Sequence, residues 1–174
     1  MTSPPELLIR PARIEDAAAM LAIYAPIVLH TPISFEIEPP SLAEFESRVR
    51  KYSAGWGWLV AEQSSQIVGY VYGSPHSERA AYKTSTNVSA YVAQSVRRQG
   101  LGRRLYEALL PILADAGYCM AFAGITLPNE PSVALHRSAG FEPAGVFPRA
   151  GRKFGVWYDV GWFHRKLRDE PLVP

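Results

Sequence analysis

The segment Arg97-Arg98-Gln99-Gly100-Leu101-Gly102-Arg103 lies between a predicted strand and a predicted helix. The start of a helix presents unpaired backbone N–H groups and the positive end of the helix dipole. Glycines let an anion approach the backbone closely, and arginine side chains add charge-assisted hydrogen bonds to phosphate. The segment predicts a site for a phosphate-bearing cofactor. Taken alone, a glycine turn with solvated arginines explains the same residues about equally well.

Two common phosphate-binding patterns are absent from this segment. The chain lacks the GK[ST] of a nucleotide-binding P-loop, and it lacks the third glycine of a dinucleotide fingerprint, since it continues as GLGRRL from Gly100. The four arginines between 97 and 104 also fit a nucleic-acid site. A net charge of only +2 gives that alternative little support.

Hydrophobic periodicity on both sides of the glycine segment predicts a mixed α/β fold with helices on the faces of a sheet. Ser41 and Glu44 form a capping box, and we expect Pro26 to distort or end its helix. We expect strands or extended segments over 6–10, 31–37, 58–62, 67–74, 85–92, 119–125 and 156–167. We expect helices over 17–28, 42–52, 101–117 and 131–139.

Length and composition indicate a single domain over 1–174, with an ordered core of about 6–168. The 48% of apolar residues suffices for a core, which excludes a wholly disordered chain. Cys119 is the single cysteine, so no intrachain disulfide forms, as is usual in a reducing cytosol. Neither a signal peptide nor a long apolar stretch is evident. We therefore expect a soluble cytoplasmic protein without membrane or nucleic-acid partners.

The glycine segment also carries a family resemblance. Together with the preceding Ser-Ala-Tyr-Val at 89–92 and the following Leu-Pro-Asn-Glu-Pro-Ser-Val-Ala-Leu-His-Arg-Ser-Ala-Gly-Phe at 127–141, it resembles the acetyl-CoA loop and downstream helix of the GCN5-related N-acetyltransferase (GNAT) superfamily. Further segments resemble the phosphinothricin and methionine sulfoximine N-acetyltransferase branch: 10–12, 31–36, 58–62, 81–82 and 151–159. The resemblance covers roughly 8–167. It implies a mostly antiparallel sheet splayed at the acetyl-CoA site, and usually a homodimer.

The resemblance implies which residues hold acetyl-CoA. The strand end and the glycine loop supply Ala90, Tyr91, Val92, Arg97, Arg98, Gln99, Gly100, Leu101, Gly102 and Arg103. Asn129 and Ser132 are candidates for contact with the pantetheine arm, although helix capping explains them as naturally. A backbone N–H near Tyr91 or Val92, directed inward by a strand bulge, would polarise the thioester carbonyl.

Acetyl transfer requires an amine that has lost its proton. Such amines are mostly protonated at neutral pH, because a model α-amino group has a pKa of about 7.7 to 8.0. The resembling family typically places a glutamate before the cofactor loop, and this chain has Asn87 there, which is no base. The proton then leaves through water held by Asn87 and Ser89, or through another residue, or the free-amine fraction suffices. A plain strand hydrogen bond is an equally good explanation of Asn87.

Transfer also requires a proton for the departing thiolate. The resemblance assigns this role of general acid to His136, four residues before the Gly140-Phe141 pair. An unperturbed histidine pKa near 6.5 permits proton exchange at neutral pH. An isolated helical histidine is more often packed or at the surface, but the matching branch also has histidine here.

A small zwitterionic acceptor would need a cation for its carboxylate and apolar walls for its side chain. The cationic candidates are Arg79, Lys83 and Lys153, and the aromatic candidates are Phe35, Tyr82 and Trp157, for which core packing is the commoner fate. By resemblance the segments 31–36 and 76–89, with Asn87, Val88 and Ser89, border this pocket, and 151–157 reaches it from a partner subunit. The loop 74–82 is one residue longer than in the family and lacks its usual tryptophan, so the acceptor stays open.

These observations predict an N-acetyltransferase that acetylates the α-amine of a small amino-acid-like acceptor by direct transfer in a ternary complex. The alternatives are another amine, such as a peptide N-terminus or a polyamine, and a CoA-binding module without catalysis, suggested by Asn87. His30, His76 and His164 are scattered, and with one cysteine the chain has no metal-ligand spacing, so we expect no metal. No GxSxG motif supports a hydrolase.

Overall fold

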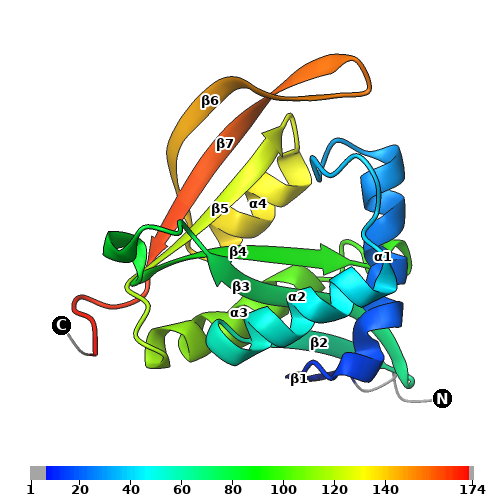
Figure 1. Ribbon diagram of the computed structural model, residues 1–174, viewed down its shortest axis with the longest axis horizontal. Coiled ribbons are helices and arrows are strands. Elements are labelled where there is room, and N and C mark those ends of the chain that lie inside the picture. The colour runs from blue at the N-terminus through cyan, green and yellow to red at the C-terminus, as the bar shows by residue number, and fades with distance from the viewer. Residues whose placement is uncertain (1–6, 173–174) are drawn as a thin grey trace.

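The computed structural model describes residues 7–172 and places seven strands in one sheet with helices on both faces (Figure 1). The order in the sheet is β1-β2-β3-β4-β5-β7-β6. The strands are β1 (Leu7–Pro11), β2 (Trp58–Gln63), β3 (Gln66–Pro75), β4 (Ser85–Val92), β5 (Met120–Leu127), β6 (Glu142–Lys153) and β7 (Val156–Lys166). The helices are α1 (Ala17–His30), α2 (Leu42–Gly55), α3 (Leu101–Asp115) and α4 (Glu130–Ser138).

The centre of the sheet opens between β4 and β5. These two strands run parallel, whereas the other neighbours are antiparallel. Their ladder has three residue pairs and ends at Asn87 and Phe122. Beyond that pair the strands diverge (Figure 1). The expected sheet, mostly antiparallel and splayed, is confirmed.

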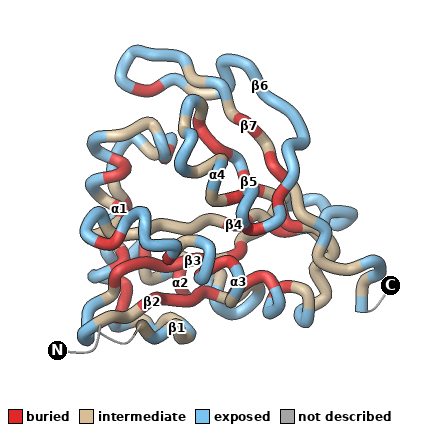
Figure 2. Tube along the Cα trace, turned by 180° about the vertical axis from the view of Figure 1, so that it is seen from behind, coloured by how far each residue is buried: buried red, intermediate tan, exposed pale blue. Residues whose placement is uncertain are grey.

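Each face of the sheet has its own hydrophobic core. Helices α3 and α4 cover one face, where Leu101, Leu105 and Leu109 recur every four residues of α3 and are buried. Helices α1 and α2 cover the other face, around Met20 and Trp58. The buried stretches in Figure 2 follow these two layers on the central strands. Two packed layers hold the central strands in place, and with them the opening between β4 and β5.

Most expected elements are present, and the capping box is formed: Ser41 Oγ accepts from the N–H of Glu44, whose carboxylate accepts from the N–H of Ser41. The 58–62 and 67–74 hairpin is β2–β3. Two expectations were wrong. Helix α1 continues through Pro26 to His30, because Ile27 and Val28 beyond it are buried, and segment 31–37 is a loop rather than extended strand. Glu6, expected to begin the first strand, lies outside the described residues.

Strand β6 was not expected from the sequence. It contains Pro143, Gly145, Pro148 and Gly151, residues that weaken a strand signal and are tolerated at a sheet edge. Its register with β7 shifts at two places, and most of the strand is exposed (Figure 2). β6 and β7 form a long hairpin that rises from the sheet (Figure 1). Over residues 7–172, no helix is both long and apolar enough to cross a lipid bilayer.

Candidate active site

A narrow cavity of about 60 Å³ lies where β4 and β5 diverge. Seven predicted site residues line it: Val88, Ser89, Ala90, Tyr91, Asn129, Ser132 and His136. Ile33, which also lines it, belongs to the segment 31–36 expected beside the acceptor, whereas the sequence missed the remaining lining residues, Tyr106, Ala123, Gly124, Ile125 and Thr126. Four of these belong to β5, which reads in the sequence as an ordinary buried strand. One edge of β5 is accessible to a ligand only because the β4–β5 ladder stops at Asn87 and Phe122.

Asn87 lies at the base of this opening, in the last pair of the ladder. Its Oδ1 is 2.8 Å from Nδ1 of His76, and its Nδ2 donates to the carbonyl of Pro75 at 3.4 Å. The ring of His76 stacks on Phe122, with 4.4 Å between centroids, and Tyr82 lies 5.4 Å away. From the sequence, His76 belongs to the segment 76–89 expected beside the acceptor, but its side chain was assigned no role. Its position beside Asn87 follows from the register of β3 on β4.

His136 is buried, with 6% of its surface exposed, and is held at both nitrogens. Its Nδ1 lies 2.8 Å from the carbonyl oxygen of Ser132, which can only accept, so Nδ1 carries a proton. Nε2 lies 2.9 Å from the hydroxyl of Tyr106 and accepts from it in the neutral ring. Burial lowers the pKa of His136, and it raises the pKa of Tyr106. His136 and Tyr106 are therefore a hydrogen-bonded pair on the cavity wall.

The glycine loop leads into α3. Gly100 has φ +75° and caps the helix, and a Cβ built on it would meet nothing within 4 Å. Arg97 and Arg98 are exposed beside it. The first backbone bond of the helix runs from Arg104 N to Gly100 O, so the N–H groups of the first turn remain available. Backbone N–H donors and the two arginine side chains thus surround the open space at Gly100.

The second glycine of the loop has a packing role. A Cβ on Gly102 would lie 2.8 Å from Cδ2 of Leu135, so this glycine lets α4 approach α3 closely. Arg103 is bound by Glu107 at 2.7 Å, one turn along α3. Asn129 Oδ1 accepts from Ser132 N at 3.3 Å and caps α4. Asn129 therefore both caps α4 and lines the narrow cavity.

The segments expected around the acceptor approach the cavity from the α1 side. Ile33 of the 31–37 loop lines the cavity. Phe35 and Tyr82 are partly exposed, and Arg79 is exposed in the loop between β3 and β4. These side chains are accessible to a small molecule. β4 pairs with β3 in unbroken register from Thr86 to Val92, so the expected bulge near Tyr91 is not present.

Lys153 is the predicted acceptor residue whose setting differs from expectation. It is 3% exposed, and its Nζ donates to the carbonyls of Val28 and Ser34 at 2.6 and 2.7 Å. Val28 is one of the last four residues of α1, whose carbonyls have no partner within the helix. Within one protomer Lys153 therefore connects the β6–β7 hairpin to α1 and the 31–37 loop. Two of the three Nζ donors are used in this way.

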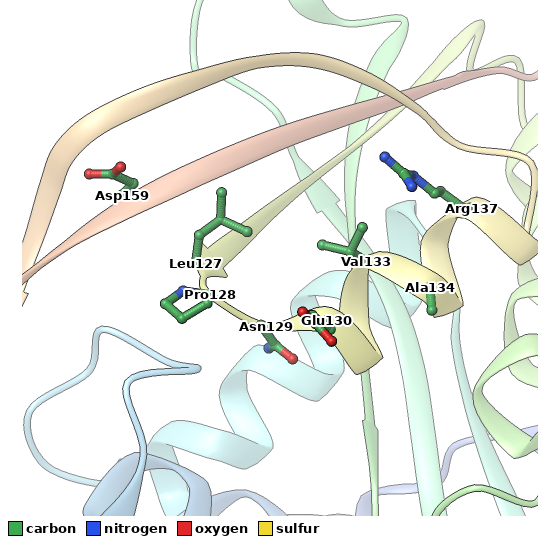
Figure 3. Close-up of a pocket in the computed structure, with 8 residues that line it drawn as sticks. All are labelled: Leu127, Pro128, Asn129, Glu130, Val133, Ala134, Arg137 and Asp159. Atoms are coloured by element: carbon green, nitrogen blue, oxygen red, sulfur yellow. The ribbon is translucent and has the colours of Figure 1, made fainter.

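A second, larger cavity of about 670 Å³ lies between α4, the end of β5 and strand β7 (Figure 3). It is lined by Leu127, Pro128, Asn129, Glu130, Val133, Ala134, Arg137 and Asp159. Neither His136 nor any residue of β4 lines it, and it shares only Asn129 with the narrow cavity. The residues predicted from the sequence therefore gather at the narrow cavity, although it is the smaller of the two. Across 7–172, no group of three His, Cys, Asp or Glu side chains is arranged as a metal site.

Comparison with known families agrees with this geometry. The family described as Acetyltransferase (GNAT) domain matches residues 9–162, most of the chain. The chain therefore belongs to the GNAT family of acetyltransferases, and it is an N-acetyltransferase.

Similar proteins narrow the branch within this family. Phosphinothricin N-acetyltransferase of Streptomyces coelicolor is 34% identical over 166 residues, covering 93% of this chain and 97% of that protein. The L-methionine sulfoximine/L-methionine sulfone acetyltransferase of Pseudomonas aeruginosa is 32% identical over 171 residues, with 95% and 98% covered. A solved GNAT superfamily phosphinothricin acetyltransferase from Sinorhizobium meliloti, in complex with acetyl-CoA, has a TM-score of 0.91 at 29% identity, with 96% and 94% covered. The expected resemblance to this branch is confirmed.

Proposed function

We propose that the protein transfers the acetyl group of acetyl-CoA to the α-amine of a small amino-acid-like acceptor, of the phosphinothricin, methionine sulfone or methionine sulfoximine type. The observation that carries this proposal is the opening between β4 and β5 beside the glycine loop. The names of the similar proteins support the acceptor class.

The residues of the loop and the opening fit acetyl-CoA. Open space at Gly100, the free N–H groups of α3 and the exposed Arg97 and Arg98 suit the phosphates. Asn129 and Ser132 line the way inward and suit the pantetheine arm. Beyond Asn87 the facing edges of β4 and β5 do not pair, so their backbone groups can bond to an extended amide chain. When bound, acetyl-CoA supplies the acetyl group as a thioester.

We propose His136 as the general acid. Nε2 of His136 takes up a proton and passes it into the cavity through the hydroxyl of Tyr106, which donates to the leaving sulfur. The lowered pKa of His136 makes its protonated form a stronger acid than an exposed histidine. Replacing His136 by Phe should lower kcat more than affinity for acetyl-CoA, which steady-state kinetics and calorimetry measure separately.

We propose direct transfer in a ternary complex. Cys119 stands before β5 and is not among the cavity-lining residues, so its thiol is poorly placed to carry an acetyl group. Incubation with acetyl-CoA and phosphinothricin should give the N-acetylated product while the mass of the intact protein stays unchanged. An acetylated protein formed before the acceptor is added, and consumed by it, would contradict direct transfer.

We also propose a homodimer that works in the cytoplasm, where acetyl-CoA and a lone reduced cysteine are both expected. The β6–β7 hairpin carries exposed apolar side chains, each between 49% and 58% exposed: Val146, Phe147, Phe154, Val156 and Trp157. Apolar side chains gathered on an edge hairpin favour an interface. The hairpin also contacts the 31–37 loop near the acceptor, so a partner there would lie close to the site.

The competing function is a CoA-binding module without catalysis, because Asn87 cannot accept a proton from the amine. Tight binding of CoA with no acetylation of any amine would favour that alternative. Measurable acetylation of any amine would exclude it.

A further inference from the structure

We propose that His76 is the general base of the acetyl transfer, and that Asn87 is the residue that positions it. The inference rests on the proposed function, because it assigns the group that removes a proton from the acceptor ammonium. It starts from a pair of side chains that the sequence did not connect. His76 directly follows the last residue of β3. Asn87 lies on β4, eleven residues further along the chain.

His76 lies at the point where the sheet opens. Its ring is hydrogen-bonded to Asn87 and stacked on Phe122, and these two residues form the last pair between β4 and β5. The next residue of β4, Val88, already lines the cavity. Tyr82, from the loop expected to border the acceptor, lies on another side of the ring. The imidazole therefore lies between Tyr82 and the last residue pair of the β4–β5 ladder, next to the cavity rather than in its lining.

The hydrogen bonds determine which nitrogen of His76 is basic. Asn87 Nδ2 donates to the carbonyl of Pro75, which fixes the amide so that Oδ1 faces His76. An amide oxygen can only accept, so Nδ1 of His76 carries the hydrogen. In a neutral imidazole the proton is then absent from Nε2, whose lone pair is free. Within residues 7–172, Nε2 has no hydrogen-bond partner.

The contacts of His76 remain in place when its ring gains a proton. Once Nε2 gains a proton, Nδ1–H keeps its bond to Asn87 and the charge lies over the ring of Phe122. A cation over an aromatic face is attracted to it. Asn87 cannot act as the base itself. By accepting the hydrogen of His76 Nδ1, it leaves Nε2 of the same ring free to accept a proton.

The proposed step is a proton transfer that balances. An N–H bond of the acceptor ammonium breaks, its electron pair remains on nitrogen, and the proton bonds to Nε2 of His76. The amine then uses that pair to form the new C–N bond, while the C–S bond breaks and its electrons leave with sulfur. The nitrogen loses a second proton as the amide forms. The sulfur takes its proton from the Tyr106–His136 pair, and the second nitrogen proton replaces the one that this pair has given up. His76 returns the first proton to solvent, so the reaction releases one proton net.

The first test uses the protein without ligands and reads the imidazole directly. Long-range proton–nitrogen NMR spectra distinguish a ring protonated at Nδ1 from one protonated at Nε2. We expect His76 to carry its hydrogen on Nδ1 in the unmodified protein, and Asn87→Ala to give a mixture. A wild-type ring protonated on Nε2 would overturn the proposal.

The second test measures kcat/KM with the best amine of a panel. His76→Ala should lower kcat/KM by about 100-fold, the usual contribution of a general base, while the affinity for acetyl-CoA is unchanged. Free imidazole in the buffer should restore part of the rate to this variant. His76→Gln keeps the polarity of the side chain and should lose as much activity. The matched control is His164→Ala. His164 is a part-buried histidine on β7, which is the neighbour of β5 in the sheet, and its loss should leave wild-type kinetics.

The outcomes separate this inference from the function it rests on. Unchanged kcat/KM in His76→Ala, or a loss in a folded variant that free imidazole does not reverse, would overturn His76 as the base and leave the acetyltransferase intact. No turnover by the wild-type protein with any amine would overturn the proposed function itself.

Discussion

Gly100 and Gly102 are two residues apart, and the structure gives them different tasks. Gly100 has a positive φ and open space around it, so its lack of a side chain permits the backbone turn and leaves room for the phosphates of the proposed cofactor. Gly102 has ordinary backbone geometry but lies against Leu135 of α4. The sequence pattern alone assigns both glycines to phosphate binding, because a pattern shows spacing and not what lies opposite.

At Gly100, a β-branched side chain should impair cofactor binding. Gly100→Val should raise the KM for acetyl-CoA, because the backbone is strained at φ +75° and the side chain fills the space beside the phosphates. Gly117→Val is the matched control, since Gly117 also has a positive φ but ends α3 at its far end. It should lose comparable stability in thermal melting without a change in this KM. An unchanged KM in Gly100→Val would contradict the loop assignment.

At Gly102, the predicted effect is on packing. Gly102→Ala should destabilise the protein by about 1 to 3 kcal/mol, because the new methyl group overlaps the side chain of Leu135. The double variant with Leu135→Ala should recover part of that loss, and urea unfolding of the four proteins gives the coupling energy. Strictly additive losses would show that the two residues do not press on each other.

His136 should make stability depend on pH. Burial holds its folded-state pKa below the usual 6.5, so between the two values the unfolded chain binds more protons than the folded one. This stabilisation is complete above pH 6.5 and is lost as the pH falls through the folded pKa. Urea unfolding at about pH 8 and about pH 5.5 should show a loss of at most roughly 1.4 kcal/mol per pH unit from this group. His136→Gln should reduce the loss, and an equal loss in both proteins would exclude His136 as its source.

Among the elements, the β6–β7 hairpin has an unexpected anchor. Lys153 ties it to the C-terminal end of α1, where a cation also suits the negative end of the helix dipole, and to the loop that contributes Ile33 to the cavity. A Cβ on the neighbouring Gly151 would overlap the ring of Phe35. The hairpin therefore holds the acceptor loop in place.

Removing this anchor should cost stability. Lys153→Met should lower the free energy of unfolding by about 2 kcal/mol, because two buried carbonyls lose their donor. The control is Lys166→Met, since Lys166 is exposed and pairs only with exposed Asp169 and should change little. Chemical denaturation measures both. A Lys153→Met protein as stable as the control would show that the two bonds contribute nothing net.

The elements that the sequence predicted are those with local signals. Ser41 and Glu44 fix the start of α2 within four residues, and the short polar turn between β2 and β3 fixes a hairpin. β6 was missed because its prolines and glycines mask a strand that β7 supports from one side. Pro26 does not end α1, because Ile27 and Val28 beyond it are buried in the tertiary structure and keep the helix going. Local rules fail where packing partners far along the chain decide the conformation.

The same division applies to the site. Val88 to Tyr91, Asn129, Ser132 and His136 were found because motif spacing places them, and they meet in one cavity. The β5 residues and Tyr106 were missed because their role depends on where two strands separate, which no local pattern encodes. The contact between His76 and Asn87 was missed because the two residues meet across a strand pair, although His76 stands in the segment 76–89 expected beside the acceptor.

For the whole molecule, the exposed apolar hairpin predicts a dimer. Light scattering should give twice the chain mass of 19.2 kDa for the wild-type protein and the single mass for Phe147→Lys, which puts a charge into the proposed interface. Leu8→Lys is the control, because Leu8 is as exposed but lies on β1 at the opposite edge of the sheet. A wild-type monomer, or a dimer that survives Phe147→Lys, would exclude this face as the interface.

The central claim is that the opening between β4 and β5 carries acetyl transfer to a small amino-acid amine. Thiol release from acetyl-CoA tests it most directly, measured across phosphinothricin, methionine sulfone, methionine sulfoximine, ordinary amino acids, short peptides and polyamines. The account predicts fast release with the first three and little with the rest. Release confined to peptides or polyamines would contradict the proposed acceptor, and silence across the whole panel would contradict the proposed catalysis.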